Sequence, residues 1–173
     1  MPPYFSATNL GVSGQTMTQM ITTGTSNVDP LFGNNTRRMI GWGGTNDLAI
    51  GGDSAATLYA NIVTYANARK AAGWKVILIG ILPRGAGAGA SFETRRTTVN
   101  ASLRADFATP TAFTNIYTGA AYADYFIDLE GDADIGQSGD ELNPTFYTDE
   151  IHLTNAGYAI VAGYAKNALS FFP

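Results

Sequence analysis

The chain has 173 residues, 45% of them hydrophobic and only 14% charged, which is typical of one well-packed globular domain and excludes a disordered segment. Its net charge of −4 argues against a nucleic-acid partner, because such binding depends on clustered Lys and Arg. The absence of cysteine excludes disulfides, a thiol nucleophile and thiolate metal sites. We expect no membrane partner, because no apolar run is long enough to cross a bilayer, and no secretion signal is visible, which leaves the compartment open.

The N-terminal part of the chain predicts a short strand, residues 4–10, that runs into a glycine-containing turn at residues 11–16 and then a helix. Glycine lets main-chain N–H groups point at a ligand at a helix start. A plain strand-to-helix loop would explain the same residues, so both interpretations stay open. Residues 22–36 read as a polar connection with turn signals.

A second strand is predicted at residues 38–42, and polar side chains follow it at Asn46 and Asp47. In open α/β sheets, ligands bind beyond the carboxyl ends of the strands, so both residues are placed to meet one. An amide such as Asn46 can donate to a developing oxyanion, although Asn-Asp is also a common turn pair.

The middle of the chain alternates helix and strand. Residues 54–72 have the apolar spacing of a helix that stops at Gly73. Residues 75–82 form a nearly continuous apolar run, as expected of a strand covered on both faces. The glycine-alanine loop that follows, residues 83–90, either gates a site or is a flexible linker.

The C-terminal part continues the alternation. A helix is predicted at residues 93–107, a strand at 125–129, an acidic loop at 130–147 and a terminal helix at 156–172. Strands alternating with helices predict a parallel sheet covered on both faces, and no repeat or domain boundary interrupts the chain. We therefore expect one α/β domain over residues 1–173 with three layers, α/β/α.

The only histidine, His152, follows Asp149 by three residues. Histidine takes and returns a proton near neutral pH, and a carboxylate three residues away in a turn can hold one imidazole nitrogen while the other faces a substrate. The same stretch also reads as a helix entry capped by Thr154 or Asn155. The two interpretations are compatible.

Taken together, these motifs resemble the SGNH (GDSL-type) hydrolase superfamily, whose members carry four short sequence blocks on a flavodoxin-like sheet. Residues 9–16 resemble the second block, with Gly14 at the oxyanion-binding glycine. Residues 44–47 resemble the third, with Asn46 as the amide donor. Residues 149–152 resemble the last, and residues 81–84 are similar to the connection after the family's fourth strand.

The resemblance implies a serine-type ester hydrolase that acts on small acyl esters, either short-chain or carbohydrate O-acyl esters, without a metal or cofactor. His152 would be the base and Asp149 the acid that orients it. The side chain of Asn46 and the N–H of Gly14 would stabilise the oxyanion.

The first family block, a strand that ends in the nucleophile Gly-Asp-Ser, has no counterpart before Asn9, where only eight residues stand. We therefore expect an N-terminally shortened sheet of about four strands, without the usual first one. The triplet ending in Ser54 follows the third block and opens a helix, so Ser54 is interpreted as a helix cap. Ser13, beside Gly14, is the tentative substitute nucleophile.

Two alternatives follow from the missing block. The chain would be a catalytically silent binding module or a truncated hydrolase if no serine replaces the nucleophile, unless His152 activates water directly at a far lower rate. The missing strand also leaves a sheet edge open, which favours a homo-oligomer.

Overall fold

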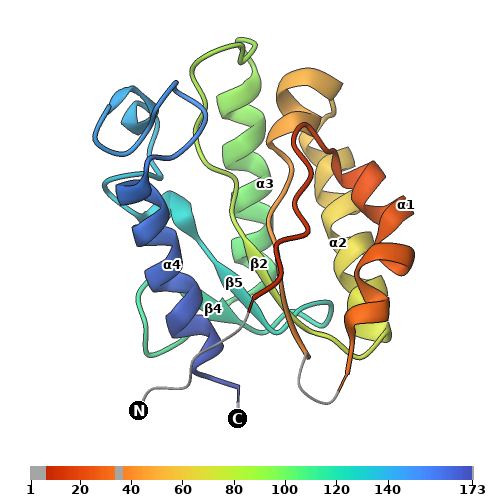
Figure 1. Cartoon of the computed structure of the whole chain (residues 1–173). Coiled ribbons are helices and arrows are strands. Elements are labelled where there is room, and N and C mark those ends of the chain that lie inside the picture. Colours follow the sequence, from red (N-terminus) through yellow and green to blue (C-terminus); the bar gives the residue numbers. More distant parts are fainter. Residues whose placement is uncertain (1–6, 34–36, 173) are drawn as a thin grey trace.

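The computed structural model describes residues 7–33 and 37–172, and it forms a three-layer α/β/α structure around a five-stranded sheet (Figure 1). Three strands are parallel, and an antiparallel pair extends the sheet beyond them. The strand order is β1 (Arg38–Gly41), β2 (Lys75–Ile79), β5 (Tyr125–Ile127), β4 (Ile116–Thr118) and β3 (Thr109–Pro110).

The central strand β2 separates two cores. Val76 and Leu78 pack into the core on one face, whereas Ile77 and Ile79 pack into the core on the other. This alternation follows the two-residue period of a strand, and it explains why the sequence here is apolar without interruption.

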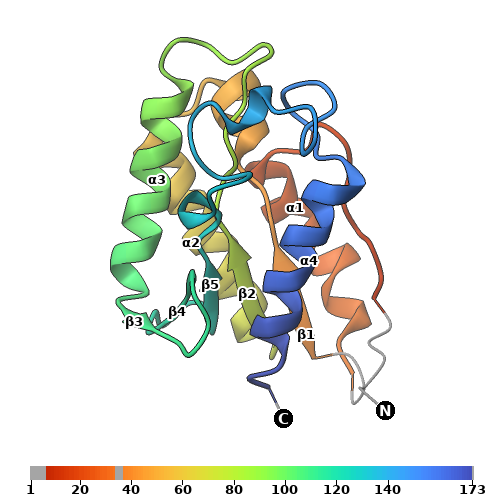
Figure 2. The same cartoon turned by 90° about the vertical axis from the view of Figure 1, so that its left-hand side faces the viewer.

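The helices divide unequally between the two faces, as Figure 2 shows from the side of α4. One face carries three helices that pack on one another, and the other carries a single helix together with the loops that follow β5. The three are α1 (Met17–Asn27), α2 (Ala55–Ala71) and α3 (Phe92–Asp106), and the single one is α4 (Asn155–Leu169). Within residues 7–33 and 37–172, no helix combines the length and apolar character that a membrane crossing requires.

Local sequence signals explain where three of these helices begin. Thr16 and Gln19 form a reciprocal capping box at the start of α1. Ser54 caps α2 by accepting the N–H of Thr57, and Thr154 caps α4 by accepting the N–H of Gly157. The interpretation of Ser54 as a helix cap is therefore confirmed.

The N-terminal prediction was wrong in two places. Residues 7–10 form no strand and are exposed, and residues 4–6 of the predicted strand lie outside the described residues. The helix α1 runs on to Asn27, although a polar connection was predicted from residue 22. The reason is that the hydroxyls of Thr22, Thr23 and Ser26 bond back to the helix carbonyls, so a polar stretch is compatible with a helix here.

The sheet also differs from the prediction in detail. The pair β3 and β4 adds two antiparallel strands to the expected parallel ones, but strands of two and three residues leave no periodic signal in the sequence. In the described chain β1 pairs only with β2, and the side of β1 that carries Ile40 is 40% exposed at that residue. The edge of β1 away from β2 therefore has no partner strand within the described residues.

Candidate active site

The loops that carry the predicted site residues gather at one end of the molecule, the upper end in Figures 1 and 2. This is the end at which the three parallel strands finish. The loops after β1, β2 and β5 and the turn before α1 all lie there. The structure therefore brings the three motif segments to the edge of the sheet where α/β proteins bind ligands.

Asp149 and His152 contact each other within one tight turn. The Nδ1 atom of His152 lies 2.8 Å from Oδ2 of Asp149, and the other carboxylate oxygen accepts the main-chain N–H of His152 at 2.7 Å. An isolated bridge between Tyr147 and Leu153 and a hydrogen bond from Thr148 N–H to the His152 carbonyl close the turn. The imidazole orientation is thus fixed from one side, which leaves Nε2 as the nitrogen that can face a ligand.

These hydrogen bonds also determine the charge of Asp149. The hydrogen bond from the His152 side chain, followed by the one from its main-chain N–H, lowers the pKa of Asp149 from 3.8 to about 2. Asp149 is therefore ionised at every pH at which the protein would work. A permanent carboxylate is the partner that an imidazole needs if it is to gain a proton.

Glu150 makes one of the contacts that hold the turn to the rest of the molecule. This residue adopts a left-handed conformation with φ of 63°, which is uncommon for a side chain other than glycine or asparagine. Its carbonyl accepts the N–H of Gly85 at 3.0 Å, so the glycine-alanine loop after β2 is bonded directly to the Asp149–His152 turn. Strained backbone of this kind is found preferentially at functional sites.

Asn46 lies beside the turn that contains Gly14. One N–H of its side-chain amide donates to the carbonyl of Gln15 at 3.1 Å. A primary amide has two N–H donors, so the second is left for a ligand while the first fixes the orientation. Gly14 has φ of 76°, and its N–H has no hydrogen-bond partner within the described residues.

Asp47 does not face a ligand, contrary to the prediction. It is 1% exposed, and both of its carboxylate oxygens accept the N–H of Met17, at 2.9 and 3.1 Å. Burial raises its pKa, while the hydrogen bond from Met17 opposes that rise. Asp47 therefore attaches the loop after β1 to the first turn of α1, where a negative charge also complements the helix dipole.

The structure does not bring Ser13 into contact with His152. Ser13 is exposed on the turn closed by the hydrogen bond from Gln15 N–H to the Val12 carbonyl, and its hydroxyl has no partner among the described residues. The hydroxyl of Ser54 is engaged at the start of α2, 2.8 Å from that of Thr57. Ser13 is thus the freer of the two serines.

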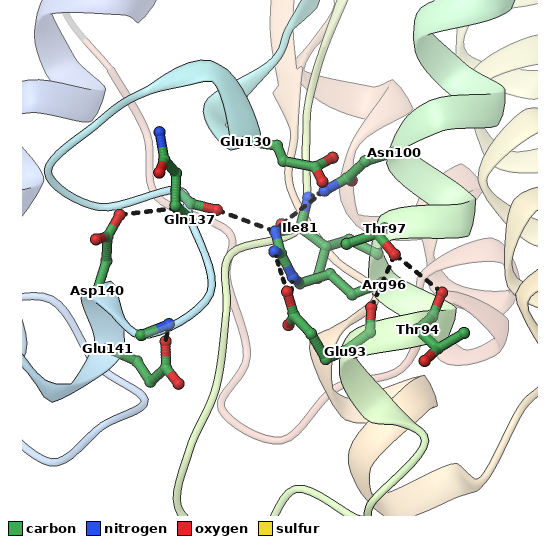
Figure 3. Close-up of polar contacts among 12 residues, drawn as sticks. Ile81, Glu93, Thr94, Arg96, Thr97, Asn100, Glu130, Gln137, Asp140 and Glu141 are labelled. Carbon is green, nitrogen blue, oxygen red and sulfur yellow. Dashed lines mark hydrogen bonds and ion pairs between the residues drawn. The ribbon is translucent and has the colours of Figure 1, made fainter.

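Arg96 joins two of the loops near the candidate site, and the sequence analysis missed it (Figure 3). It is 1% exposed and donates to the carbonyls of Ile81, after β2, and Gly136, in the loop before the Asp149–His152 turn, at 3.1 and 3.2 Å. The carboxylate of Glu93 balances its charge. The i, i+3 spacing of Glu93 and Arg96 signals the ion pair, but nothing in the sequence indicates that it lies inside the protein.

The described loops at this edge of the sheet carry an imidazole held in one orientation and two N–H groups, of Asn46 and Gly14, that have no acceptor. An imidazole of this kind can accept a proton, and free N–H groups can stabilise negative charge on an oxygen. In the part of the chain that the structure describes, no three His, Cys, Asp or Glu side chains are arranged to hold a metal ion.

Comparison with known proteins supports the fold independently. A putative acylhydrolase of Bacteroides fragilis superposes with a TM-score of 0.70 at 24% identity, over 91% of this chain and 71% of that one. A GDSL-like lipase of Bacteroides thetaiotaomicron gives 0.65 at 23%, over 91% and 72%. The SGNH-hydrolase family esterase AlinE4 gives 0.50 at 18%, over 95% and 76%.

No curated protein matches the chain. A family model does match it, over residues 3–160, which is most of its length. The chain therefore belongs to the GDSL-like lipase/acylhydrolase family.

Proposed function

We propose that this protein is a serine-type hydrolase of small acyl esters, either short-chain esters or O-acyl esters of carbohydrates. Membership of the family supports acyl hydrolysis in general. The observation that carries the proposal is the 2.8 Å contact between Asp149 and the Nδ1 atom of His152, because it orients the one histidine as a base.

In the proposed reaction, Nε2 of His152 takes the proton of a hydroxyl as its oxygen attacks the ester carbonyl. The histidine then gives the proton to the alcohol that leaves, and a water molecule repeats the cycle on the acyl-enzyme. The ionised Asp149 stabilises the imidazolium in each half of the reaction. The side chain of His152 is 65% exposed, so a substrate can reach it.

The negative charge that develops on the carbonyl oxygen is assigned to Asn46 and Gly14. The second amide N–H of Asn46 and the main-chain N–H of Gly14 make no other hydrogen bond within the described residues, which supports this role. Removing one such donor typically slows an acyl transfer about 10²–10³-fold. Asn46→Ala should lower kcat by that factor, and unchanged activity would remove Asn46 from the mechanism.

Ser13 is our candidate nucleophile because its hydroxyl makes no hydrogen bond to a described residue, whereas that of Ser54 caps a helix. One observation favours the second candidate function, a binding module without turnover: no hydroxyl of the described chain is hydrogen-bonded to the His152 ring. Attack by a water molecule that His152 activates is the remaining route to hydrolysis.

A fluorophosphonate that labels activated serines separates these possibilities. We expect an adduct at Ser13 by peptide mass, lost in Ser13→Ala and His152→Ala but kept in the matched control Ser54→Ala. Turnover of a 4-nitrophenyl ester of a short-chain acid should follow the same pattern. Turnover without an adduct would assign the attack to water, and neither turnover nor adduct would leave the binding module as the function.

A further inference from the structure

Arg84 lies next to the Asp149–His152 turn and has no role in the chemistry described above. It precedes Gly85, whose N–H donates to the carbonyl of Glu150 at 3.0 Å. Glu150 directly follows Asp149 and lies two positions before His152. The guanidinium is therefore attached to the loop that is hydrogen-bonded to the Asp149–His152 turn.

The guanidinium of Arg84 is the cation at this end of the sheet that lacks a counter-charge within the described chain. Its one hydrogen bond there runs from Nε to the carbonyl of Ala86, which leaves both terminal nitrogens without an acceptor. Arg96 is buried against Glu93, and Arg95 is held by the carbonyls of Leu48 and Asp53.

Other ion pairs engage the cations farther away. They are Arg69 with Asp29, Lys70 and Lys75 with Asp124, and Arg104 with Asp128 and Glu130.

The surroundings of Arg84 leave its terminal nitrogens accessible to a ligand. Residues 85–90 are glycine and alanine only, so no bulky side chain of the loop covers the guanidinium. The nearest acid along this contact is Glu150, whose carboxylate lies against Gly85, yet Arg84 and Glu150 form no ion pair. A planar guanidinium with two free terminal nitrogens is suited to a carboxylate, which it binds through paired hydrogen bonds.

We propose that Arg84 is a substrate-binding residue that selects esters carrying a negatively charged group, such as a carboxylate, near the scissile bond. The inference rests on the proposed function, since it assigns the substrate class of that same site. The charge would be held on the loop after β2 while the ester carbonyl lies between His152 and the donors of Asn46 and Gly14. Because the contact is the same before and during the reaction, it lowers KM and leaves kcat unchanged.

The test compares two acetyl esters that differ in one charge, meta-acetoxybenzoate and meta-acetoxybenzamide, with wild type, Arg84→Gln and Arg84→Lys. Lys166→Gln is the matched control. Lys166 also forms no ion pair in the described chain, but it lies 11 residues along α4 from Asn155, roughly 16 Å from the helix start near His152.

We expect Arg84→Gln to raise KM for the benzoate ester about 10- to 100-fold, the range for a lost hydrogen bond to a charged group, with kcat and the benzamide ester unchanged. Arg84→Lys should recover part of the loss, because it keeps the charge without the planar fork. An equal loss for both esters, or an equal effect of Lys166→Gln, would show a structural role and overturn the proposal.

A second readout does not need turnover, because His152 is the only histidine and its ring proton signals in NMR spectra need no assignment. Titration with meta-hydroxybenzoate should shift these signals saturably in the wild type and far more weakly in Arg84→Gln, whereas meta-hydroxybenzamide should not distinguish the two proteins. Equal responses to both probes would overturn the assignment of Arg84. Absence of ester turnover with the predicted titration would instead contradict the proposed function and leave this binding role supported.

Discussion

The hydrogen bond between the Asp47 carboxylate and the N–H of Met17 joins two segments of the candidate site, and replacing Asp47 by alanine tests how much it contributes to stability. Met17 is 2% exposed, so its N–H would be left buried without an acceptor, which costs about 1–3 kcal/mol. The substitution also removes a buried carboxylate, whose desolvation raises the pKa of Asp47, and this gain offsets part of the cost. We expect Asp47→Ala to lower the free energy of unfolding by about 2 kcal/mol.

Urea unfolding at neutral pH would measure the change in the free energy of unfolding. An unchanged slope of this free energy against urea concentration would show that the mutant unfolds in the same transition. Asp47→Asn should cost about half as much, because its amide oxygen accepts the same N–H without the charge. Asp53→Ala is the matched control and should stay within about 0.5 kcal/mol of wild type, since its carboxylate makes no hydrogen bond within the described chain. An Asp47→Ala protein as stable as Asp53→Ala would refute the reasoning.

Three further predictions concern pH, a helix cap and association. Because the pKa of Asp149 is lowered to about 2, its stabilising effect should be complete above the ordinary value of 3.8 and be lost as the pH falls toward 2. Asp149→Asn should lack that part of the pH dependence in thermal unfolding. Ser54→Ala should destabilise the protein by about 1 kcal/mol in urea without changing ester hydrolysis, as a helix cap would. The edge of β1 that pairs with no described strand should give concentration-dependent association in sedimentation experiments, weakened by Ile40→Lys, and a monomer at all concentrations would contradict this.

The sequence predicts those features that repeat or lie close together along the chain. The apolar run of β2 indicates a strand buried on both faces, and the spacing of apolar residues in α2, α3 and α4 places these helices to within a few residues. The contact of Asp149 with His152 is predictable for the same reason, since the two residues lie three positions apart in one turn.

Contacts between distant segments could not be predicted from the sequence. Asp47 reads as a ligand-facing residue after a strand, and only the folded chain shows that it accepts the N–H of Met17, 30 positions earlier. A charged Arg96 in a helix suggests a solvent-exposed position, but two loop carbonyls and Glu93 satisfy it inside the protein. The exposed residues 7–10 differ from the prediction because Ala7 and Asn9 are of types that are uncommon in strands and no described strand pairs with this segment.

The turn that holds Asp149 and His152 depends little on the surrounding protein for its internal geometry. Its acid, base and closing hydrogen bonds lie within residues 147–153. The rest of the protein holds it through the N–H of Gly85, the hydrogen bond from the Tyr147 hydroxyl to the Ile135 carbonyl, and the burial of Tyr147 and Leu153. Because Tyr147 and Leu153 form an antiparallel bridge, these seven residues can be grafted between two antiparallel strands of another scaffold. The graft should reproduce the oriented imidazole. The two strands of the new scaffold would then determine the direction in which that imidazole points.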